Sequence, residues 1–377
     1  MPTVSIVQRI LPHYRLAFFE RLHQTLDQHG IELRLCYGQE QPGTRPGSVD
    51  FAGTWVRRVN NRYLFDEPSR QPAVWQPCLR ELVLSDLVIA EHAARLLINY
   101  PLALLSRLGG TRLALWGHGA NLQATSPRGV TDVIRDRLIH GAHWWFAYTA
   151  LSARLLERGG FPGRRITVVN NAIDTAALGE AVAATTPDSR AALRCELDLP
   201  EHGVGIFCGR LVAEKRLDLV RAAGEYVYEQ NPRFRLIVVG DGPGMNEVLQ
   251  MADECPWVRF VGPKFGADLA PYLAVADFML MPGLVGLVIV DSFAAGVPLI
   301  TTEQPTHSPE IEYLRNGENA LMTAMHPRAL ADGILDLIDS QDKLLHLRTG
   351  CRDSASEYTL DRMVQRFSAG VIAALAS

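Results

Sequence analysis

Short apolar runs alternate with amphipathic segments along most of this chain. Strands are predicted in the first half where β-branched and aromatic residues cluster, at residues 4–9, 31–37, 87–90, 113–116, 145–148 and 166–169. Between the first two runs, Leu16, Phe19, Leu22 and Leu26 fall at helical spacing. The second half repeats the pattern, with predicted strands at residues 205–208, 235–239, 257–261, 278–281 and 299–301. Because alternating strands and helices build parallel sheets covered on both faces, we predict two doubly wound α/β domains.

The join between these domains is expected between residues 170 and 200. There the chain passes through NNAID and then the Ala/Thr-rich piece AVAATTPDS, which is typical of a linker followed by an outer helix. We assign residues 1–172 to the first domain and 173–354 to the second. The last segment, 355–377, carries apolar residues at helical spacing and is predicted to be a closing helix that packs back on the first domain.

Composition narrows the class of protein. The chain has 377 residues, a formal net charge of −4 and 47% hydrophobic residues, which disfavours a nucleic-acid binder. Its six cysteines include no C-x-x-C pair, so neither a zinc site nor a disulfide scaffold is expected, and a cytoplasmic location is favoured. The N-terminus lacks the apolar stretch of a signal peptide, and the apolar run 278–290 is shorter than the roughly 20 residues of a membrane span. No membrane-crossing segment is expected.

Ligands of doubly wound domains bind at the carboxyl ends of the strands, so polar residues that follow predicted strands are the candidates. The clearest case is GRLVAEKRLDLV, where Arg210 and Lys215 flank the start of a helix. Two cations at a helix N-terminus suit a diphosphate, because arginine offers a planar fork and lysine a point charge. A solvated basic turn balanced by Glu214 and Asp218 is the alternative interpretation.

A second candidate is the segment 281–298, MPGLVGLVIVDSFAAGVP. Gly283 and Gly286 allow the backbone to approach a ligand, the following helix presents unpaired N–H groups, and Asp291 can accept from a pair of hydroxyls. A tight turn before a core helix is the alternative.

Two further turns face the same predicted edge. The GDGPG cluster contains Gly242, and the sequence RFVGPK places Val261 and Lys264 after a strand, where a flat base could lie against the backbone. GDGPG also fits a simple turn, because it lacks the G-x-G-x-x-G spacing of a dinucleotide site, and RFVGPK fits a mere turn equally well.

Residues 209–322 as a whole resemble the donor-binding half of the family-4 retaining glycosyltransferases of the GT-B fold. The matching pieces, in order, are GRLVAEKRLDLV, LIVVGDGPG, VRFVG, APYLAVADFMLMPG, DSFAAGVPLITT and PEIEYLRNGENALM. The segment YTALSARLLERGGFPGRRITVVNNAID resembles the passage between the two domains of that family. The resemblance implies an acceptor-binding first domain and a second domain that binds a nucleotide sugar.

The resemblance also implies roles for individual residues. Arg210 and Lys215 would hold the diphosphate and stabilise its charge as it leaves, and the remaining nucleotide contacts would come from Gly242, Val261, Lys264, Gly286, Leu287, Val288 and Asp291. The family usually carries two glutamates separated by seven residues. Here Asp291 stands at the second position and Gly283 at the first, so we expect the backbone of Gly286 and Leu287 to hold the donor sugar with residues of the other domain.

In the first domain, His118 follows a predicted strand in LALWGHGAN and resembles the family's histidine beside the donor sugar. With Arg210 and Lys215 it completes the expected catalytic set, and a structural loop histidine is the alternative. His13, Tyr14 and Arg15 open the first helix and suit an acceptor, unless they are surface residues at a helix start. Glu91 is a further acceptor candidate or an ordinary helix-start carboxylate.

The stretch 38–77 is rich in Gly, Pro and polar residues and is predicted to be a long loop. Its arginines Arg57, Arg58 and Arg62 could touch anionic lipid, with a solvated loop as the default.

Together these features predict a metal-independent glycosyltransferase without a cofactor that moves a hexose-like sugar from a nucleoside diphosphate to a hydroxyl in glycan or polysaccharide biosynthesis. Retention of anomeric configuration is implied by the resemblance, with same-face attack guided by the leaving phosphate. The expected partners are a nucleotide-sugar donor and a glycan or lipid-linked acceptor, with no nucleic acid and a possible peripheral contact with the inner face of the membrane. The missing glutamate leaves open a non-catalytic nucleotide-sugar-binding protein.

Overall fold

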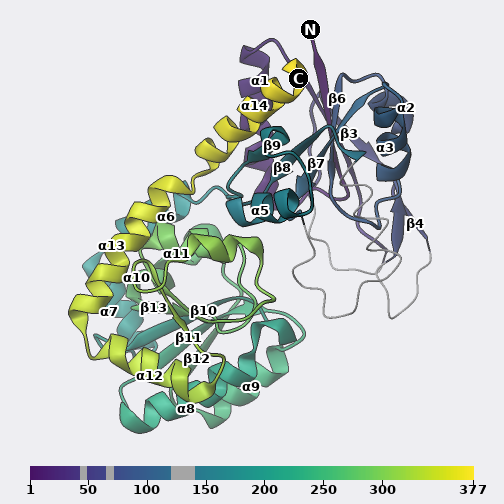
Figure 1. Ribbon diagram of the computed structural model, residues 1–377. Coiled ribbons are helices and arrows are strands. Elements are labelled where there is room, and N and C mark those ends of the chain that lie inside the picture. The colour runs from purple at the N-terminus through teal and green to yellow at the C-terminus, as the bar shows by residue number, and fades with distance from the viewer. Residues whose placement is uncertain (43–48, 65–71, 120–140) are drawn as a thin grey trace. The chain divides into compact units, whose positions relative to one another are not determined.

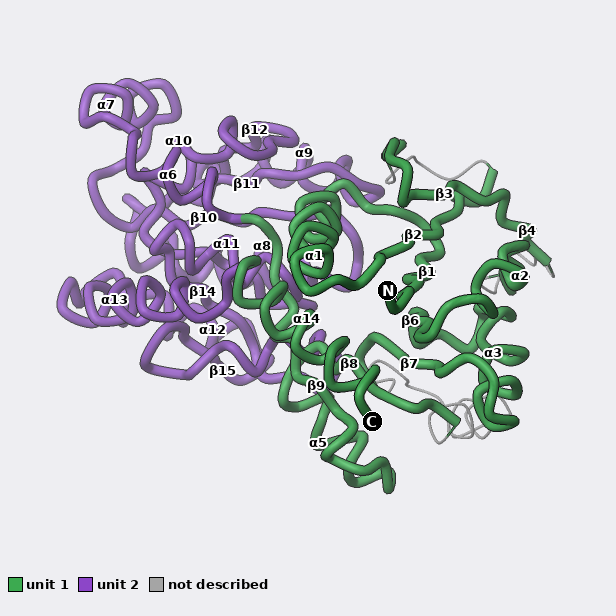
Figure 2. The backbone as a smooth tube through the Cα atoms, turned by 90° about the horizontal axis from the view of Figure 1, so that it is seen from above, with its two compact units in different colours: residues 1–174, 360–377 green, residues 175–359 purple. Residues whose placement is uncertain are grey.

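The computed structural model describes residues 1–42, 49–64, 72–119 and 141–377. The chain forms two compact units (Figure 2). Unit 1 consists of Met1–Asp174 together with Leu360–Ser377, and unit 2 of Thr175–Thr359. Each unit is built around its own parallel sheet (Figure 1).

Unit 1 contains a seven-stranded sheet in the order β3-β2-β1-β6-β7-β8-β9, and every pairing in it is parallel. Its strands, in chain order, are β1 (Thr3–Gln8), β2 (Glu32–Gly38), β3 (Val56–Val59), β6 (Leu87–Glu91), β7 (Arg112–Gly117), β8 (Trp144–Ala147) and β9 (Ile166–Val168). The six runs predicted as strands in the first half are therefore confirmed.

Helices pack on both faces of this sheet because successive strand residues point to opposite sides. The described helices of unit 1 are η1 (His13–Arg15), α1 (Leu16–Gln28), α2 (Leu79–Leu82), α3 (Asn99–Arg107), α5 (Ala150–Arg158), η2 (Gly163–Arg165) and α14 (Leu360–Ala376). Val4 and Ile6 of β1 join a core with α1 and α14. Val7 lies on the other face, in a core with α2, α3 and α5.

The prediction of one long loop over residues 38–77 was wrong for the described parts of that stretch. Val56–Val59 forms β3, which pairs with β2, while β4 (Arg62–Leu64) and β5 (Ala73–Trp75) form a small antiparallel pair. Arg57 and Arg58 lie on β3 and make ion pairs with Glu81 and Asp50. Backbone pairing to an edge strand needs no continuous apolar run, so the sequence carried little signal of it.

The closing helix α14 completes the core of unit 1. Phe367 stacks on Phe146 with ring centroids 4.3 Å apart and meets Trp116 edge-on at 5.0 Å. Gly370 lies so close to β9 that a Cβ there would be 2.5 Å from Oγ1 of Thr167. This helix is therefore an integral part of unit 1 although it lies more than 180 residues from the rest of it in the sequence.

Unit 2 contains a six-stranded parallel sheet in the order β12-β11-β10-β13-β14-β15. Its strands are β10 (Val204–Arg210), β11 (Arg235–Asp241), β12 (Val258–Gly262), β13 (Phe278–Leu280), β14 (Leu299–Thr302) and β15 (Ala320–Thr323). The first five were predicted. β15 was not, because only its first residue is fully buried and its sequence ALMT has no clear strand pattern.

The helices of unit 2 follow its strands in the expected alternation. They are α6 (Ala176–Ala184), α7 (Pro187–Glu196), η3 (Ala213–Lys215), α8 (Leu217–Gln230), α9 (Met245–Glu254), η4 (Gly266–Asp268), α10 (Ala270–Val275), α11 (Val288–Ala295), η5 (Pro309–Tyr313), α12 (Pro327–Ile338) and α13 (Gln341–Glu357). No helix in the described part of the chain is long and apolar enough to span a membrane.

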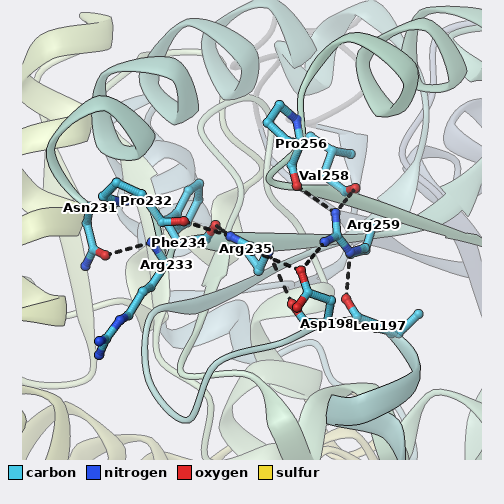
Figure 3. Close-up of polar contacts among 10 residues, drawn as sticks. All are labelled: Leu197, Asp198, Asn231, Pro232, Arg233, Phe234, Arg235, Pro256, Val258 and Arg259. Atoms are coloured by element: carbon cyan, nitrogen blue, oxygen red, sulfur yellow. Dashed lines mark hydrogen bonds and ion pairs between the residues drawn. The ribbon is translucent and has the colours of Figure 1, made fainter.

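A polar cluster holds the amino-terminal ends of β11 and β12 together (Figure 3). Asp198 lies just after α7 and accepts from Nη2 of both Arg235 and Arg259, at 3.0 and 2.9 Å. The hydrogen bond from Arg235 holds the pKa of Asp198 below its usual value. Arg259 also donates to the carbonyl oxygen of Leu197 at 2.6 Å. Arg259 thus has a structural role at the amino-terminal ends of these strands. The candidate site lies at the opposite, carboxyl-terminal ends.

Candidate functional site

The loops after β10, β11 and β13 lie at the carboxyl edge of the unit 2 sheet, because these strands run parallel. Arg210 is the last residue of β10 and lies opposite Asp241 of β11 in the register. The Arg210 side chain is exposed, and within the described residues it makes no hydrogen bond or ion pair. An arginine in this position has its full donor capacity available for an anion.

Lys215 joins two of these loops. It lies on η3, before α8, and its ammonium group donates to the carbonyl oxygen of Leu284 at 2.5 Å. Burial lowers the pKa of Lys215. The turn after β10, which contains Lys215, is therefore held against the loop after β13.

Gly283 allows the same two loops to approach closely. A Cβ at this position would lie 2.3 Å from the carbonyl oxygen of Glu214 and 2.3 Å from the carbonyl carbon of Lys215. Leu284 donates its N–H to the same oxygen of Glu214 at 2.7 Å. No side chain fits at position 283 in this arrangement, because the backbones of the two loops are in direct contact there.

His307 fixes this loop from the other side. It lies after β14, is 3% exposed, and is not among the residues predicted for the site. Its Nε2 lies 2.7 Å from the carbonyl oxygen of Thr302, and its Nδ1 accepts the N–H of Val285 at 3.3 Å. A carbonyl oxygen only accepts, so Nε2 carries the proton and the ring is neutral. Burial also lowers the pKa of His307, which favours the neutral ring.

The loop leads into the N-terminus of α11. Leu287 is the N-cap residue, and the backbone N–H groups of Gly286 and Leu287 have no acceptor within the described residues. Val288 is the first residue of the helix. Free N–H groups at a helix start are a ready binding site for an anion or a hydroxyl.

Asp291 lies in the first turn of α11, as predicted. It is partly buried, and burial raises the pKa of its carboxyl to about 7. Within the described residues nothing donates a hydrogen bond to this carboxyl group. It is therefore an acceptor without a partner in the described part of the chain, at the same edge as Arg210 and Lys215.

The glycines after β11 bring the backbone of that loop close to the turn after β10. Gly242 has φ +154°, and a Cβ on it would lie 2.5 Å from the carbonyl oxygen of Leu211. Gly244 donates its N–H to that oxygen at 2.9 Å. The role of Gly242 in this structure is thus to permit close packing of two site loops.

The loop after β12 contains the last predicted nucleotide contacts. Val261 is partly buried within β12, and Lys264 lies two residues beyond its end with Nζ 5.8 Å from the ring centre of Tyr272. Phe265 beside it is 72% exposed. A flat, exposed ring at this edge can stack on another flat group.

The unit 1 candidates form a separate group at the carboxyl edge of their own sheet. His118 follows β7, is exposed, and meets the ring of Tyr148 edge-on at 4.6 Å. His13 and Tyr14 are exposed on η1, with their rings 5.8 Å apart. Tyr148 lies directly after β8, and nothing in the sequence indicates its contact with His118.

Arg15 differs from its neighbours because it is 5% exposed. Its Nη2 donates to Oδ1 of Asn171 at 2.6 Å, and its guanidinium carbon lies 5.0 Å from the ring centre of Trp116. This placement favours a structural role over contact with an acceptor.

Glu91 ends β6 and accepts the N–H of Arg9 at 3.4 Å. Burial raises the pKa of its carboxyl. Glu91 is therefore a desolvated carboxyl group at this edge rather than an exposed residue at a helix start.

Known proteins resemble this chain in two ways. Residues 202–340 match the family model described as "Glycosyl transferases group 1". Among curated proteins, a D-inositol 3-phosphate glycosyltransferase of Jonesia denitrificans is 28% identical over 208 residues, 50% of this chain and 48% of the relative. A GDP-mannose-dependent alpha-(1-6)-phosphatidylinositol monomannoside mannosyltransferase of Mycobacterium tuberculosis is 25% identical over 181 residues, 44% of this chain and 46% of the relative. The chain spans about half the length of these relatives.

Solved structures resemble the whole chain in fold. Anabaena HepE in complex with UDP superposes with a TM-score of 0.71 at 17% identity, over 99% of this chain and 100% of that one. Sucrose-phosphate synthase from Thermosynechococcus elongatus superposes with a TM-score of 0.70 at 15% identity, over 98% of both chains. The chain thus has the α/β GT-B fold, and its residues 202–340 match the glycosyl transferases group 1 family.

Proposed function

We propose that this protein is a glycosyltransferase that moves a sugar from a nucleoside-diphosphate sugar to an acceptor hydroxyl in glycan or polysaccharide biosynthesis. The family match over residues 202–340 and the transferases among the relatives support the class of reaction. The residues argued to bind the donor, from Arg210 to Asp291, all fall within the matched segment.

The observation that carries the proposal is the set of unused donors at the carboxyl edge of the unit 2 sheet. Arg210 makes no side-chain hydrogen bond in the described chain, and Lys215 spends one hydrogen bond on the carbonyl oxygen of Leu284. The N–H groups of Gly286 and Leu287, just before α11, have no acceptor among the described residues. A diphosphate supplies the acceptors that these donors lack. When the sugar leaves, negative charge grows on the diphosphate, so the same cations stabilise the transition state without a metal ion.

Asp291 is the proposed acceptor for the ribose hydroxyls. Val261 and Lys264 would lie beside the base. The sugar itself would be held by the backbone at Gly286 and Leu287, because Gly283 offers no side chain, and His118 is the proposed contribution from unit 1. Retention through same-face attack, guided by the leaving phosphate, belongs to the same proposal.

The acceptor is proposed to be a glycan or a lipid-linked sugar. The Mycobacterium relative is named for a phosphatidylinositol monomannoside, and two further relatives are named alpha-monoglucosyldiacylglycerol synthase. His13, Tyr14 and Glu91 are the proposed contacts of this acceptor. A peripheral contact with the inner face of a membrane would bring the protein to a lipid-linked substrate.

A thermal-shift screen tests the donor first. UDP, UDP-glucose, GDP and GDP-mannose cover the nucleotides named for the neighbours and relatives, and a ligand that binds the folded protein raises its melting temperature. Slow hydrolysis of the best donor then tests catalysis, and the anomeric configuration of the released or transferred sugar tests retention. Donor binding with neither hydrolysis nor transfer would instead support the non-catalytic binding protein.

A further inference from the structure

Arg216 has an unusual backbone conformation for its residue type. Its φ is +57° and its ψ is +53°, which is the left-handed helical region. Two other non-glycine residues in the described part of the chain have positive φ, Asn170 and Asp198, and residues of those types tolerate this region. Arginine lacks a short polar side chain that can bond locally to the backbone, so the conformation of Arg216 is strained.

The strained residue lies at the junction of two helical segments. Arg216 is the C-cap residue of η3, which ends at Lys215, and it is also the N-cap residue of α8. Its N–H donates to the carbonyl oxygen of Ala213 at 2.9 Å, and its own carbonyl oxygen accepts the N–H of Leu219 at 3.0 Å. Leu219 and Val220 are buried, so α8 is fixed in the body of unit 2. The dihedral angles of Arg216 therefore set the orientation of Lys215 relative to that body.

The side chain of Arg216 is held by a bidentate contact with Asp218. Nε donates to Oδ1 at 2.8 Å, and Nη2 donates to Oδ2 at 2.7 Å. This pairing lowers the pKa of Asp218 below its usual value. The remaining Nη1 donates to the sulfur of Met325, just after β15, at 3.5 Å. Directed contacts of this kind fix the guanidinium group and so hold the backbone that carries it.

A contribution to global stability does not explain the pair. The Arg216 side chain is 34% exposed and the Asp218 side chain 61% exposed, and ion pairs at such positions add little to the free energy of unfolding. Strained backbone conformations, in contrast, are concentrated at functional sites, where they fix the geometry of a neighbouring group. The group to look for is therefore one whose position depends on residue 216.

The two residues before Arg216 join the turn after β10 to the loop after β13. Nζ of Lys215 donates to the carbonyl oxygen of Leu284, and the N–H of Leu284 donates to the carbonyl oxygen of Glu214. We propose that Asp218 is a positioning residue: it holds Arg216 in the left-handed conformation, which directs Lys215 to the donor and keeps the loop before α11 in place. Its effect on turnover rests on the proposed function.

Glycine at position 216 supplies the test, because glycine adopts a positive φ without strain. Asp218→Ala is expected to lower kcat for sugar transfer or donor hydrolysis about tenfold, since an unsupported strained residue leaves its conformation. When Asp218→Ala is added to Arg216→Gly, kcat is expected to change by less than about twofold, because the two positions then no longer depend on each other. The loss in Asp218→Ala should lie more in kcat than in KM, because Lys215 acts on charge that develops in the transition state.

The matched control is Asp332→Ala. Asp332 also pairs with an exposed arginine, Arg328, but both lie within the regular helix α12. This variant is expected to keep the kcat of the parent. The melting temperature of Asp218→Ala should fall no further than that of the control, which separates positioning from general stabilisation.

Hydrogen exchange at the Leu284 amide reports the contact between the two loops without the need for activity. Exchange is expected to be faster in Asp218→Ala than in the parent, whereas the double variant should exchange like Arg216→Gly. An unchanged kcat in Asp218→Ala would overturn the proposal, as would an equal loss of kcat in both backgrounds. If the parent neither transfers sugar nor hydrolyses any donor, the proposed function fails. Faster exchange in Asp218→Ala would then still support the positioning role, and unchanged exchange would refute it.

Discussion

The ammonium group of Lys215 donates to the carbonyl oxygen of Leu284 at 2.5 Å, across 69 residues of sequence. The bond fixes the position of the cation and also the path of the loop that leads into α11. Lys215 therefore contributes both a positive charge and a hydrogen bond that positions the loop. Replacements that keep the length of its side chain test what this residue contributes to catalysis.

Replacing Lys215 with methionine keeps the aliphatic stem and removes the charge and the hydrogen bond. We expect kcat for sugar transfer or donor hydrolysis to fall on the order of 100-fold or more, because a preorganised cation acts mainly on the charge that develops in the transition state. Steady-state kinetics of the Lys215→Met variant and the parent measure this fall in kcat. Lys343→Met on α13 is the control, and a Lys215→Met enzyme with a near-normal rate would remove Lys215 from the mechanism.

Arg210→Ala should leave folding unchanged, since the side chain is exposed and makes no hydrogen bond or ion pair within the described residues. Affinity for the nucleoside diphosphate is expected to fall about tenfold to 100-fold, in line with loss of a charge-assisted hydrogen bond. Arg210→Lys should recover only part, because lysine lacks the planar fork. Calorimetric titration with UDP and GDP measures the loss, with Arg233→Ala as the control. Unchanged affinity in Arg210→Ala would contradict the assignment.

Gly283→Ala should disturb the loop, because the added Cβ would lie 2.3 Å from the backbone at Glu214 and Lys215. Loss of about 1–3 kcal/mol from the free energy of unfolding is expected, together with weaker donor binding. Gly286→Ala is the matched control for stability, since its nearest neighbour would be Oγ of Ser308 at 3.4 Å. Denaturant unfolding of both variants measures the difference. If Gly283→Glu folded normally and bound donor better, the packing explanation for this glycine would be wrong.

Asp291 predicts a pH dependence. The pKa of its carboxyl is about 7 in the folded protein, above the ordinary 3.8, so the folded state binds more protons between those values. Its contribution to stability is therefore present below about pH 4 and is lost as pH rises to about 7. Asp291→Asn should unfold less readily than the parent at about pH 8, by on the order of 2 kcal/mol, and the gap should narrow at about pH 5.

The same carboxyl links pH to nucleotide binding. Ribose hydroxyls donate to the ionised form, so affinity for the nucleotide should rise with pH through about 7 in the parent and stay flat in Asp291→Asn. Titrations at several pH values measure it. Parallel pH profiles in the two proteins would show that Asp291 does not accept from the ligand.

His307→Ala removes both bonds of the buried ring and is expected to cost on the order of 2 kcal/mol of stability. Its effect on pH dependence is opposite to that of Asp291. Burial lowers the pKa of His307, so its contribution is present above the ordinary pKa near 6.5 and is lost as pH falls below it. The KM for donor should rise more than kcat falls, because the loop after β13 is displaced while the cations Arg210 and Lys215 remain. His202→Ala, at an exposed site, is the control; an unchanged KM in His307→Ala would refute a positioning role.

Much of the fold was predictable because most strands of both sheets are continuous apolar runs. Such runs as 204–207 and 236–240 are buried on both faces, and they leave a strong signal in the sequence. The edge strand β3 has the burial pattern of a half-exposed strand, and nothing in VRRV distinguishes it from a loop.

The candidate site was predictable where polar residues directly follow strands, as with Arg210, Lys215 and Asp291. The reason for Gly283 was not, since the atoms that exclude a side chain there belong to residues 214 and 215. His307 was not predicted for a similar reason. Its two partners, Thr302 and Val285, are distant in sequence and become neighbours only in the folded structure. Arg15 was predicted to contact the acceptor and is buried instead. Its position at a helix start does not indicate that Trp116 and Asn171 will contact its side chain.

The place of α14 has a consequence for how the chain is made. Ribosomes release the sequence from its N-terminus, so all of unit 2 has been synthesised before Phe367 can reach Phe146 and Trp116. Residues 1–174 must therefore wait, with the part of their core that α14 covers exposed, until residues 360–377 emerge. The unit that begins first is completed last, and during that interval the nascent protein exposes apolar core residues that can aggregate or bind chaperones.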